Sequence, residues 1–139
     1  KSIKPGRGRI LIMDDEEEIR QVANDMVTFL GYETEISMNG KEAVRRYSQA
    51  MAQNKPYDAV ILDLTVRGAM GGKETIQELL KLDPQVAAIV SSGYSNDPVL
   101  ANYHEYGFRG VVAKPYHLED MADILNRVLQ EKNHRQQHV

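Results

Sequence analysis

Five short apolar runs alternate with five longer segments that carry helix signals, and this alternation limits the fold more than any other feature of the sequence. Each run is short enough for a strand, and three are almost continuously apolar, which is typical of strands covered on both faces. The "ETEIS" run is more polar, so we predict that it lies at an edge of the sheet. The runs are "RILIM" (9–13), "ETEIS" (33–37), "DAVIL" (58–62), "VAAIVS" (86–91) and "GVVA" (110–113).

The segments between the runs have helical spacing of apolar residues and recognisable ends. A first helix is predicted over 17–30, where Gly31 follows as a stop signal. Asp97 and Pro98 can provide the cap and the first residue of a helix that runs to Tyr106. The other helices are predicted over 39–52, 72–82 and 118–132. Strands and helices that alternate in this way predict an α/β fold, a doubly wound parallel sheet with helices on both faces.

Length and composition suit a single domain of this kind. Residues 1–8 are predicted to be a linker, residues 9–132 the domain, and residues 133–139 a polar tail. The 139 residues include no cysteine, which excludes disulfides and thiolate metal sites and favours a reducing compartment such as the cytoplasm. The net charge is −3 with both signs mixed, so nucleic-acid binding is not indicated. No apolar run is long enough for a membrane span, and we predict no membrane contact.

Polar residues that can do chemistry follow four of the apolar runs. The first run ends at Asp14 and Asp15, the third at Asp63, the fourth at Ser92 and the fifth at Lys114. In parallel α/β sheets, ligands bind outside the carboxyl ends of the strands. We therefore expect three carboxylates, a hydroxyl and an ammonium group to share one shallow site.

Three neighbouring carboxylates disfavour one another's ionised forms, so this site needs a compensating cation. Mg²⁺ prefers oxygen ligands and an open position of this kind, with Mn²⁺ as an alternative, whereas Zn²⁺ would want histidine or cysteine. Beside such a cation, Asp63 can act as a nucleophile toward phosphorus and form an aspartyl phosphate. The metal, Lys114 and Ser92 would then neutralise the equatorial oxygens of the transferred group.

Each of these residues also has a plainer interpretation. An aspartate after a strand is usually a turn residue or a helix cap, and Ser92 before Gly93 fits ordinary turn chemistry. Lys114 alone would be read as a solvated charge. The joint placement of all of them at strand ends favours a site.

Taken together, these motifs resemble the receiver domain of two-component response regulators over about residues 9–131. The resemblance rests on the acidic pair Asp14-Asp15, on Asp63 after "AVIL", on Ser92-Gly93, and on "KP" at Lys114. It implies a flavodoxin-like sheet with strand order 2-1-3-4-5. The chain also resembles the receivers at the C-terminal end of hybrid sensor histidine kinases, in its linker and in the phrase "SSGYS".

The resemblance implies a role for each motif position. Asp63 would be the phosphoacceptor, and Lys114 and Ser92 would contact the phosphoryl group, with Ser92 as the switch hydroxyl. The magnesium ligands would be Asp14, Asp15, Asp63 and the backbone carbonyl of Thr65. Thr65 and Tyr94 would tune hydrolysis of the acyl phosphate, and the bond before Pro115 would be cis. One position departs from the family: Val111 stands where relatives usually have an aromatic switch residue.

We therefore predict a magnesium-dependent phosphoacceptor switch rather than a conventional enzyme. Its partner would be a histidine kinase or a histidine phosphotransfer protein, and a weak homodimer stays open. The surface that changes would be the face formed by the helix over 97–106, the strand over 110–113 and the last helix. Two alternatives remain: a phosphatase working through an aspartyl phosphate, which usually has a second aspartate where Thr65 stands, and a degenerate receiver that only binds protein.

Overall fold

The computed structural model describes residues 5–94 and 96–137 of the chain. Residues 1–4 of the predicted linker and residues 138–139 of the predicted tail lie outside the described residues. The described part of the linker runs along the domain, where the Gly6 amide donates to the carbonyl of Leu30 and the Glu33 amide donates to the carbonyl of Gly8. These contacts tie the linker to the turn that follows the first helix.

One parallel five-stranded sheet forms the centre of the molecule, in the order β2-β1-β3-β4-β5. The predicted strand order is confirmed, and the polar strand β2 lies at an edge as expected. The apolar residues of β1, β3 and β4 are fully buried because helices cover both faces. The strands are β1 (Arg9–Met13), β2 (Glu33–Ser37), β3 (Ala59–Asp63), β4 (Ala88–Ser92) and β5 (Gly110–Ala113).

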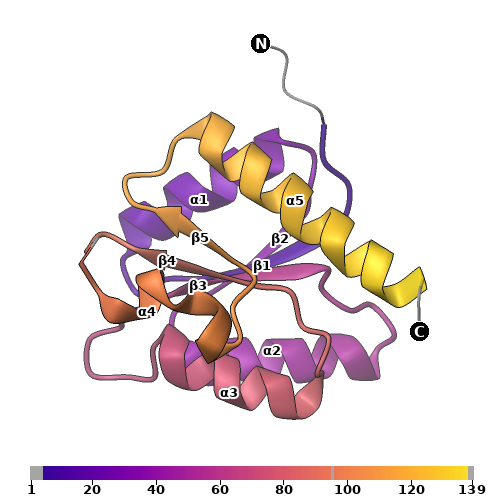
Figure 1. Cartoon of the computed structure of the whole chain (residues 1–139), viewed down its shortest axis with the longest axis horizontal. Coiled ribbons are helices and arrows are strands. Elements are labelled where there is room, and N and C mark those ends of the chain that lie inside the picture. Colours follow the sequence, from indigo (N-terminus) through magenta and orange to yellow (C-terminus); the bar gives the residue numbers. More distant parts are fainter. Residues whose placement is uncertain (1–4, 95, 138–139) are drawn as a thin grey trace.

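Helices cover the two faces in the manner of a doubly wound sheet. In Figure 1, α1 and α5 lie above the sheet and α2, α3 and α4 lie below it. The side chains of β1, β3, β4 and β5 alternate between two cores, one under α1 and α5 and one under α2 and α3. The helices are α1 (Glu17–Phe29), α2 (Gly40–Ala52), α3 (Gly72–Leu82), α4 (Pro98–Ala101) and α5 (Leu118–Gln137), with a 3₁₀ helix η1 (Tyr103–Tyr106) after α4.

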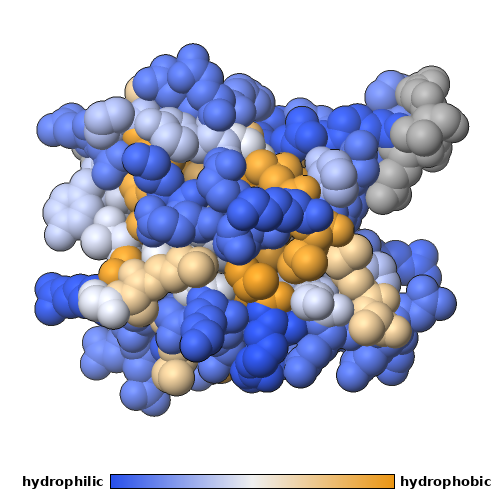
Figure 2. Space-filling view, turned by 90° about the horizontal axis from the view of Figure 1, so that it is seen from below, coloured by the Kyte–Doolittle hydropathy of each residue, from blue (hydrophilic) through white to orange (hydrophobic). Residues whose placement is uncertain are grey.

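The face of α2 and α3 is the one turned toward the viewer in Figure 2. Apolar side chains reach this surface between rows of hydrophilic ones. Among the apolar residues of these two helices, Met51 and Leu82 are 39% and 38% exposed. None of the helices within residues 5–94 and 96–137 combines the length and the apolar character that a bilayer crossing requires.

Two predicted elements differ from the structure. The single helix predicted from Pro98 to Tyr106 is instead one turn of α-helix followed by η1, because Asn102 leaves helical geometry at φ −121° and ψ 36°. The carbonyl of Pro98 accepts both the backbone amide and the side-chain amide of Asn102, at 3.1 and 3.2 Å, so the side chain shares the acceptor of the last helical hydrogen bond. The predicted polar tail is helical as far as Gln137, because residues 133–137 contain no glycine or proline that would end α5.

Candidate functional site

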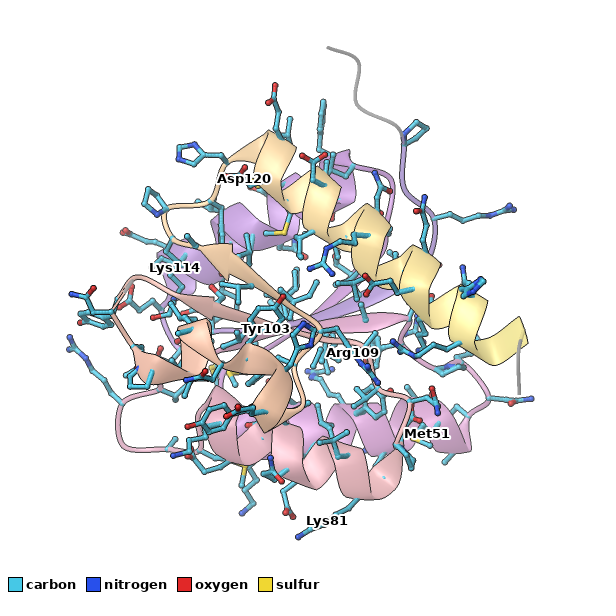
Figure 3. The ribbon with its side chains drawn as sticks, in the orientation of Figure 1. Met51, Lys81, Tyr103, Arg109, Lys114 and Asp120 are labelled. Carbon is cyan, nitrogen blue, oxygen red and sulfur yellow. The ribbon has the colours of Figure 1, made fainter. Side chains whose placement is uncertain are left out.

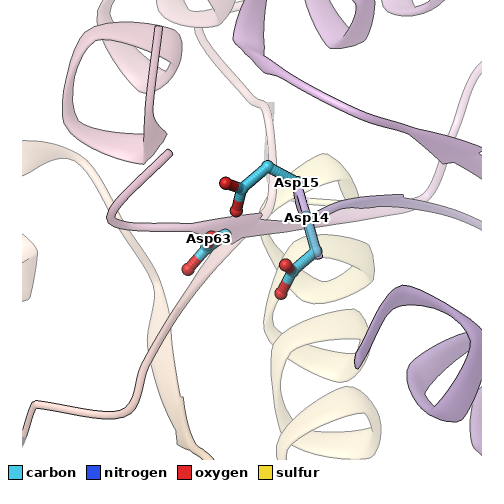
Figure 4. Close-up of side chains that lie close together, drawn as sticks. All are labelled: Asp14, Asp15 and Asp63. Carbon is cyan, nitrogen blue, oxygen red and sulfur yellow. The ribbon is translucent and has the colours of Figure 1, made fainter. Parts of the chain in front are cut away.

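The carboxyl edge of the sheet brings together the acidic residues that the sequence analysis selected. Asp14 follows β1 directly and Asp63 is the last residue of β3, so both leave the sheet at the same level. Figure 4 shows the carboxylates of Asp14, Asp15 and Asp63 gathered at this edge. Each offers an oxygen, and these oxygens lie within 4.8 Å of one another. Asp14 and Asp63 are only 1% and 3% exposed, whereas Asp15 is partly exposed.

Backbone contacts hold the acidic pair in place. The amide of Asp14 donates to the carbonyl of Ser37 at the end of β2, and the guanidinium of Arg20 donates to the carbonyl of Asp14 at 2.9 Å. Oδ1 of Asp14 accepts the amide of Glu16 at 2.9 Å, at the start of α1. The Arg67 amide, in the loop after β3, donates to Oδ2 of Asp15 at 3.3 Å. The pair is therefore anchored from β2, α1 and the loop after β3.

Glycines let the loop after β3 return closely over the end of its own strand. A Cβ atom at Gly72 would lie 2.9 Å from the carbonyl oxygen of Asp63, and one at Gly71 would lie 2.6 Å from that of Leu64. Such contacts are too close for any side chain. These two glycines thus allow α3 to begin directly against the backbone of Asp63.

Lys114 places its ammonium group between two of the carboxylates. Its Nζ lies 2.8 Å from Oδ2 of Asp14 and donates a hydrogen bond of 3.0 Å to Oδ1 of Asp63. Figure 3 labels Lys114 near the tip of β5, and its amide donates to the carbonyl of Ser92 in β4. The peptide bond between Lys114 and Pro115 is cis, the form that the family resemblance implies.

Burial and charge shift the ionisation of this site. Burial raises the pKa of Asp63 to about 6, the hydrogen bond from Lys114 opposes that rise, and the charge of Asp14 adds to it. Burial alone would lower the pKa of Lys114, but its hydrogen bonds and ion pairs with Asp14 and Asp63 raise it above its ordinary value. One ammonium group therefore faces three carboxylates, which leaves an excess of negative charge.

The donor set fits a hard divalent cation. All three grouped side chains are carboxylates, and carboxylate oxygen is the ligand that Mg²⁺ prefers. Among the described residues, Oδ2 of Asp14 is buried without a hydrogen bond of good geometry, although Lys114 lies within ion-pair distance. A second cation at the open side of the cluster would satisfy this oxygen and balance the charge.

The end of β4 supplies hydroxyl groups from two adjacent serines. Oγ of Ser92 accepts the amide of Tyr94 at 3.0 Å. Ser91 lies opposite Asp63 in the register of β3 and β4, and its Oγ is hydrogen bonded at 2.6 Å to the hydroxyl of Tyr116. Burial raises the pKa of Tyr116 to about 12, so its hydroxyl stays protonated in the ordinary range of pH.

A cavity of about 610 Å³ opens over Asp63. Its polar wall includes Asp15, Thr65, Ser92 and Lys114, which the sequence analysis placed here, together with Tyr94. Its apolar wall comes from α1 and from the loop after β5, through Ile19, Val22, Pro115 and Tyr116, and Arg67 also lines it. Access to Asp63 is therefore bordered by charge on one side and by apolar side chains on the other.

Val111 departs from the family as expected, whereas a contact between Tyr116 and Ser91 was not predicted. Val111 lies in β5, half-buried against the core under α2 and α3, so an aliphatic side chain occupies the usual aromatic position. Tyr116 and Ser91 were not selected as site residues, because their 25-residue separation hides the hydrogen bond between them. The only signal for Tyr116 in the sequence is an aromatic residue two positions after Lys114.

The family model for the response regulator receiver domain matches residues 10–126. The chain belongs to this family. The match runs from Ile10 in β1 through β5 and into the first part of α5, and it includes every element that contributes to the site. The chain is therefore a receiver domain of two-component signalling, as the resemblance of its motifs implies.

Named relatives agree with this assignment. The chain is 32% identical over 121 residues to the chemotaxis protein CheY of Thermotoga maritima. This alignment covers 86% of the chain and 96% of CheY. It is 27% identical over 125 residues to sporulation initiation phosphotransferase F of Bacillus subtilis, covering 90% of the chain and 96% of that protein. Both relatives consist of little more than the matched domain.

Solved structures share the fold. A CheY-like receiver domain protein from Methanospirillum hungatei has a TM-score of 0.79 at 25% identity, covering 96% of the chain and 99% of that structure. NtrX from Brucella abortus has a TM-score of 0.83 at 21% identity, with 95% of the chain but only 29% of NtrX covered. The same fold thus occurs as a small protein and as one part of a larger one.

Receiver domains in general bind Mg²⁺ and interact with histidine kinases or phosphotransfer proteins. The acidic cluster of Asp14, Asp15 and Asp63 is compatible with that metal.

Proposed function

We propose that this receiver accepts a phosphoryl group on Asp63 from a phosphohistidine donor, in a reaction that depends on Mg²⁺. The observation that carries the proposal is the position of Asp63: it lies at the floor of the cavity, and Lys114 donates to one of its oxygens. A carboxylate oxygen that faces an open cavity beside a fixed ammonium group is suited to attack on phosphorus.

The step balances without any further reactant. A carboxylate oxygen of Asp63 forms a bond to phosphorus, and the bond from phosphorus to the donor's imidazole nitrogen breaks, leaving its electron pair on that nitrogen. Mg²⁺, when bound, would supply positive charge for the phosphoryl oxygens and the carboxylates. Asp14, Asp15, Asp63 and the carbonyl of Thr65 would hold it.

The remaining polar residues would stabilise the transferred group. Lys114 can turn one hydrogen from Asp63 toward a phosphoryl oxygen while it keeps its ion pair with Asp14. Ser92 now accepts the amide of Tyr94, and its hydroxyl hydrogen is free to point at a second phosphoryl oxygen. Thr65 and Tyr94, both at the cavity, would control the approach of water to the acyl phosphate.

Partner and context follow from the same surface. A donor histidine must enter the cavity, so its protein would rest on the border formed by α1 and the loop after β5, where Val22 is 50% exposed. We propose a histidine kinase or phosphotransfer protein as this partner, in the cytoplasm, with the chain acting as the receiver of a hybrid kinase. Phosphorylation would alter the face of α4, β5 and α5, where Val111 requires a route other than an aromatic rotamer change.

A mass measurement tests the proposal. The protein is incubated with Mg²⁺ and acetyl phosphate, and its intact mass is followed with time. We expect the wild type to gain one phosphoryl group and Asp63→Asn to gain none. The control Asp58→Asn, at the opposite end of β3, should gain one as the wild type does. Absence of any gain would contradict the proposal and favour a receiver that only binds protein, and rapid release of free phosphate would favour the phosphatase.

A further inference from the structure

The loop after β5 is fastened to β4 at two points on either side of Pro115. On one side, the backbone amide of Lys114 donates to the carbonyl of Ser92 at 3.1 Å. On the other side, the hydroxyl of Tyr116 is hydrogen bonded to Oγ of Ser91 at 2.6 Å. Two consecutive residues of β4 therefore hold the residues before and after Pro115.

The second attachment lies deep in the site. Ser91 is 0% exposed and is paired with Asp63 in the register of the sheet, so the hydrogen bond lies beside the strand end that carries Asp63. Tyr116 packs against the core under α1 and α5 and also lines the cavity. The charges of Lys114, Asp14 and Asp63 all influence the pKa of its hydroxyl.

Lys114 needs such support because its side chain is long and has two competing partners. Nζ must stay within 2.8 Å of Asp14 and 3.0 Å of Asp63, although a free lysine side chain samples many rotamers. Movement of its backbone would require the side chain to readjust toward both carboxylates at once. A rigid anchor two residues away restricts that movement, since the loop between the anchors contains only Pro115.

We propose that Tyr116 is a positioning residue: its hydrogen bond to Ser91 holds the Lys114–Pro115 turn so that Lys114 stays between Asp14 and Asp63. This inference rests on the proposed function, because Lys114 is the residue whose position matters for phosphoryl transfer. The Tyr116 hydroxyl touches no reacting atom and acts only through Lys114. Removal of either partner of the hydrogen bond should therefore have the same consequence.

The test compares Tyr116→Phe, Ser91→Ala and the double variant in phosphorylation by acetyl phosphate, followed by intact mass. Each single variant should react about three- to ten-fold more slowly, the effect expected for one hydrogen bond. The double variant should be no slower than the slower single one. The matched control is Tyr32→Phe, which removes another buried tyrosine hydroxyl, bonded to Asn126 at 3.4 Å in the same core; its rate should equal that of the wild type.

Two further readouts separate positioning from general damage to the fold. The Mg²⁺ concentration that gives half the maximal rate should not increase in either single variant, because the carboxylates keep their places. A disturbed site would bind Mg²⁺ more weakly and would raise this concentration. In the protein without Mg²⁺, amide hydrogen exchange should speed up over residues 110–117 in Tyr116→Phe and Ser91→Ala but not in Tyr32→Phe. This second readout needs no phosphorylation.

Several results would overturn the inference. They are wild-type rates in both single variants, losses that multiply in the double variant, a higher Mg²⁺ requirement, and unchanged exchange over residues 110–117. If the wild type itself takes up no phosphoryl group, the proposed function fails, and the exchange comparison alone decides whether the hydrogen bond holds the turn.

Discussion

Ionic groups are buried at both ends of the parallel strands, which we call the amino edge and the carboxyl edge of the sheet. The two ends differ in how these groups are paired. At the amino edge, Lys132 is 8% exposed and its Nζ donates to the backbone carbonyls of Tyr57 and Asp58. The half-buried Asp58 in turn accepts the amide of Arg9 at 2.7 Å, so Lys132 and Asp58 are each hydrogen bonded to the backbone. At the carboxyl edge, three carboxylates share the ammonium group of Lys114.

Under the proposed function, the difference separates structural charges from those that take part in phosphoryl transfer. A buried charge whose hydrogen bonds are satisfied by the backbone of its own fold needs nothing further. A cluster with two more negative groups than positive ones stays incomplete until a cation or a reacting group arrives. Figure 3 labels Lys114 and Arg109 near opposite ends of β5, and these residues directly follow and directly precede that strand, so the strand itself separates the two environments.

The two ends of the sheet should differ most in how replacement of their lysines, Lys114 and Lys132, changes the rate of phosphorylation. Lys114→Met should slow phosphorylation by acetyl phosphate about 10²- to 10³-fold, because it removes one preorganised charged donor from the transferred group. Lys132→Met should leave the rate unchanged, since Lys132 lies at the other edge. Intact mass against time measures both, and equal losses in the two variants would remove the distinction between the edges.

Much of this site follows from the sequence because strand ends are visible in it. The apolar runs place Asp63 and Ser92 at the ends of β3 and β4, and parallel strands bring those ends together. Boundaries were less accurate: β4 begins at Ala88 rather than at the predicted position 86, where Val86 instead donates to Asp83 in a turn. Turn contacts of this kind leave no mark in the apolar pattern.

The parts that the sequence did not predict depend on long-range or competing hydrogen bonds. Periodicity continues the fourth helix through Asn102, whereas in the structure the backbone leaves helical geometry there and the side chain also bonds to the carbonyl of Pro98. The link between Tyr116 and Ser91 joins the loop after β5 to β4, and nothing local distinguishes Tyr116 from an ordinary core aromatic. Single-sequence patterns report which face a residue occupies but not which distant atom it meets.

Stability should depend on pH through the carboxyl edge. Since the pKa of Asp63 is raised to about 6 in the folded protein, the folded state binds this proton more tightly than the unfolded chain does. The protonated Asp63 carboxyl therefore adds to the free energy of unfolding below about pH 4, and this contribution is lost as the pH rises through 6. Without Mg²⁺, Asp63→Asn should therefore gain up to about 3 kcal/mol relative to wild type between pH 4 and 7.

Urea denaturation at several pH values measures this difference. Asp58→Asn serves as the control because Asp58 belongs to the amino edge and bonds to the Arg9 amide. Its free energy of unfolding relative to wild type should not follow the Asp63 pattern. Parallel pH profiles for wild type and Asp63→Asn would show that Asp63 does not carry the excess charge.

A divalent cation should stabilise the protein through the carboxyl edge. At ten times its dissociation constant, Mg²⁺ should add about 1.4 kcal/mol to the free energy of unfolding. Asp15→Asn should reduce this gain because it weakens Mg²⁺ binding. Glu17→Gln, in the first turn of α1, should keep the gain, because Glu17 is not one of the three clustered carboxylates. Thermal unfolding with and without MgCl₂ at constant ionic strength measures the effect, and an equal gain in all three proteins would indicate nonspecific screening.

The smallest effect is expected from the stability of the amino edge. Lys132→Met removes two hydrogen bonds to carbonyls, at 3.4 and 3.2 Å, but it also removes the cost of burying a charge, which lowers the pKa of Lys132. These terms oppose each other, so the free energy of unfolding should fall by only about 1 kcal/mol. Urea denaturation at pH 7 measures it. A loss of several kcal/mol would mean that Lys132 compensates the charges of Asp58 and Asp83, and that the amino edge, like the carboxyl edge, depends on a shared cation.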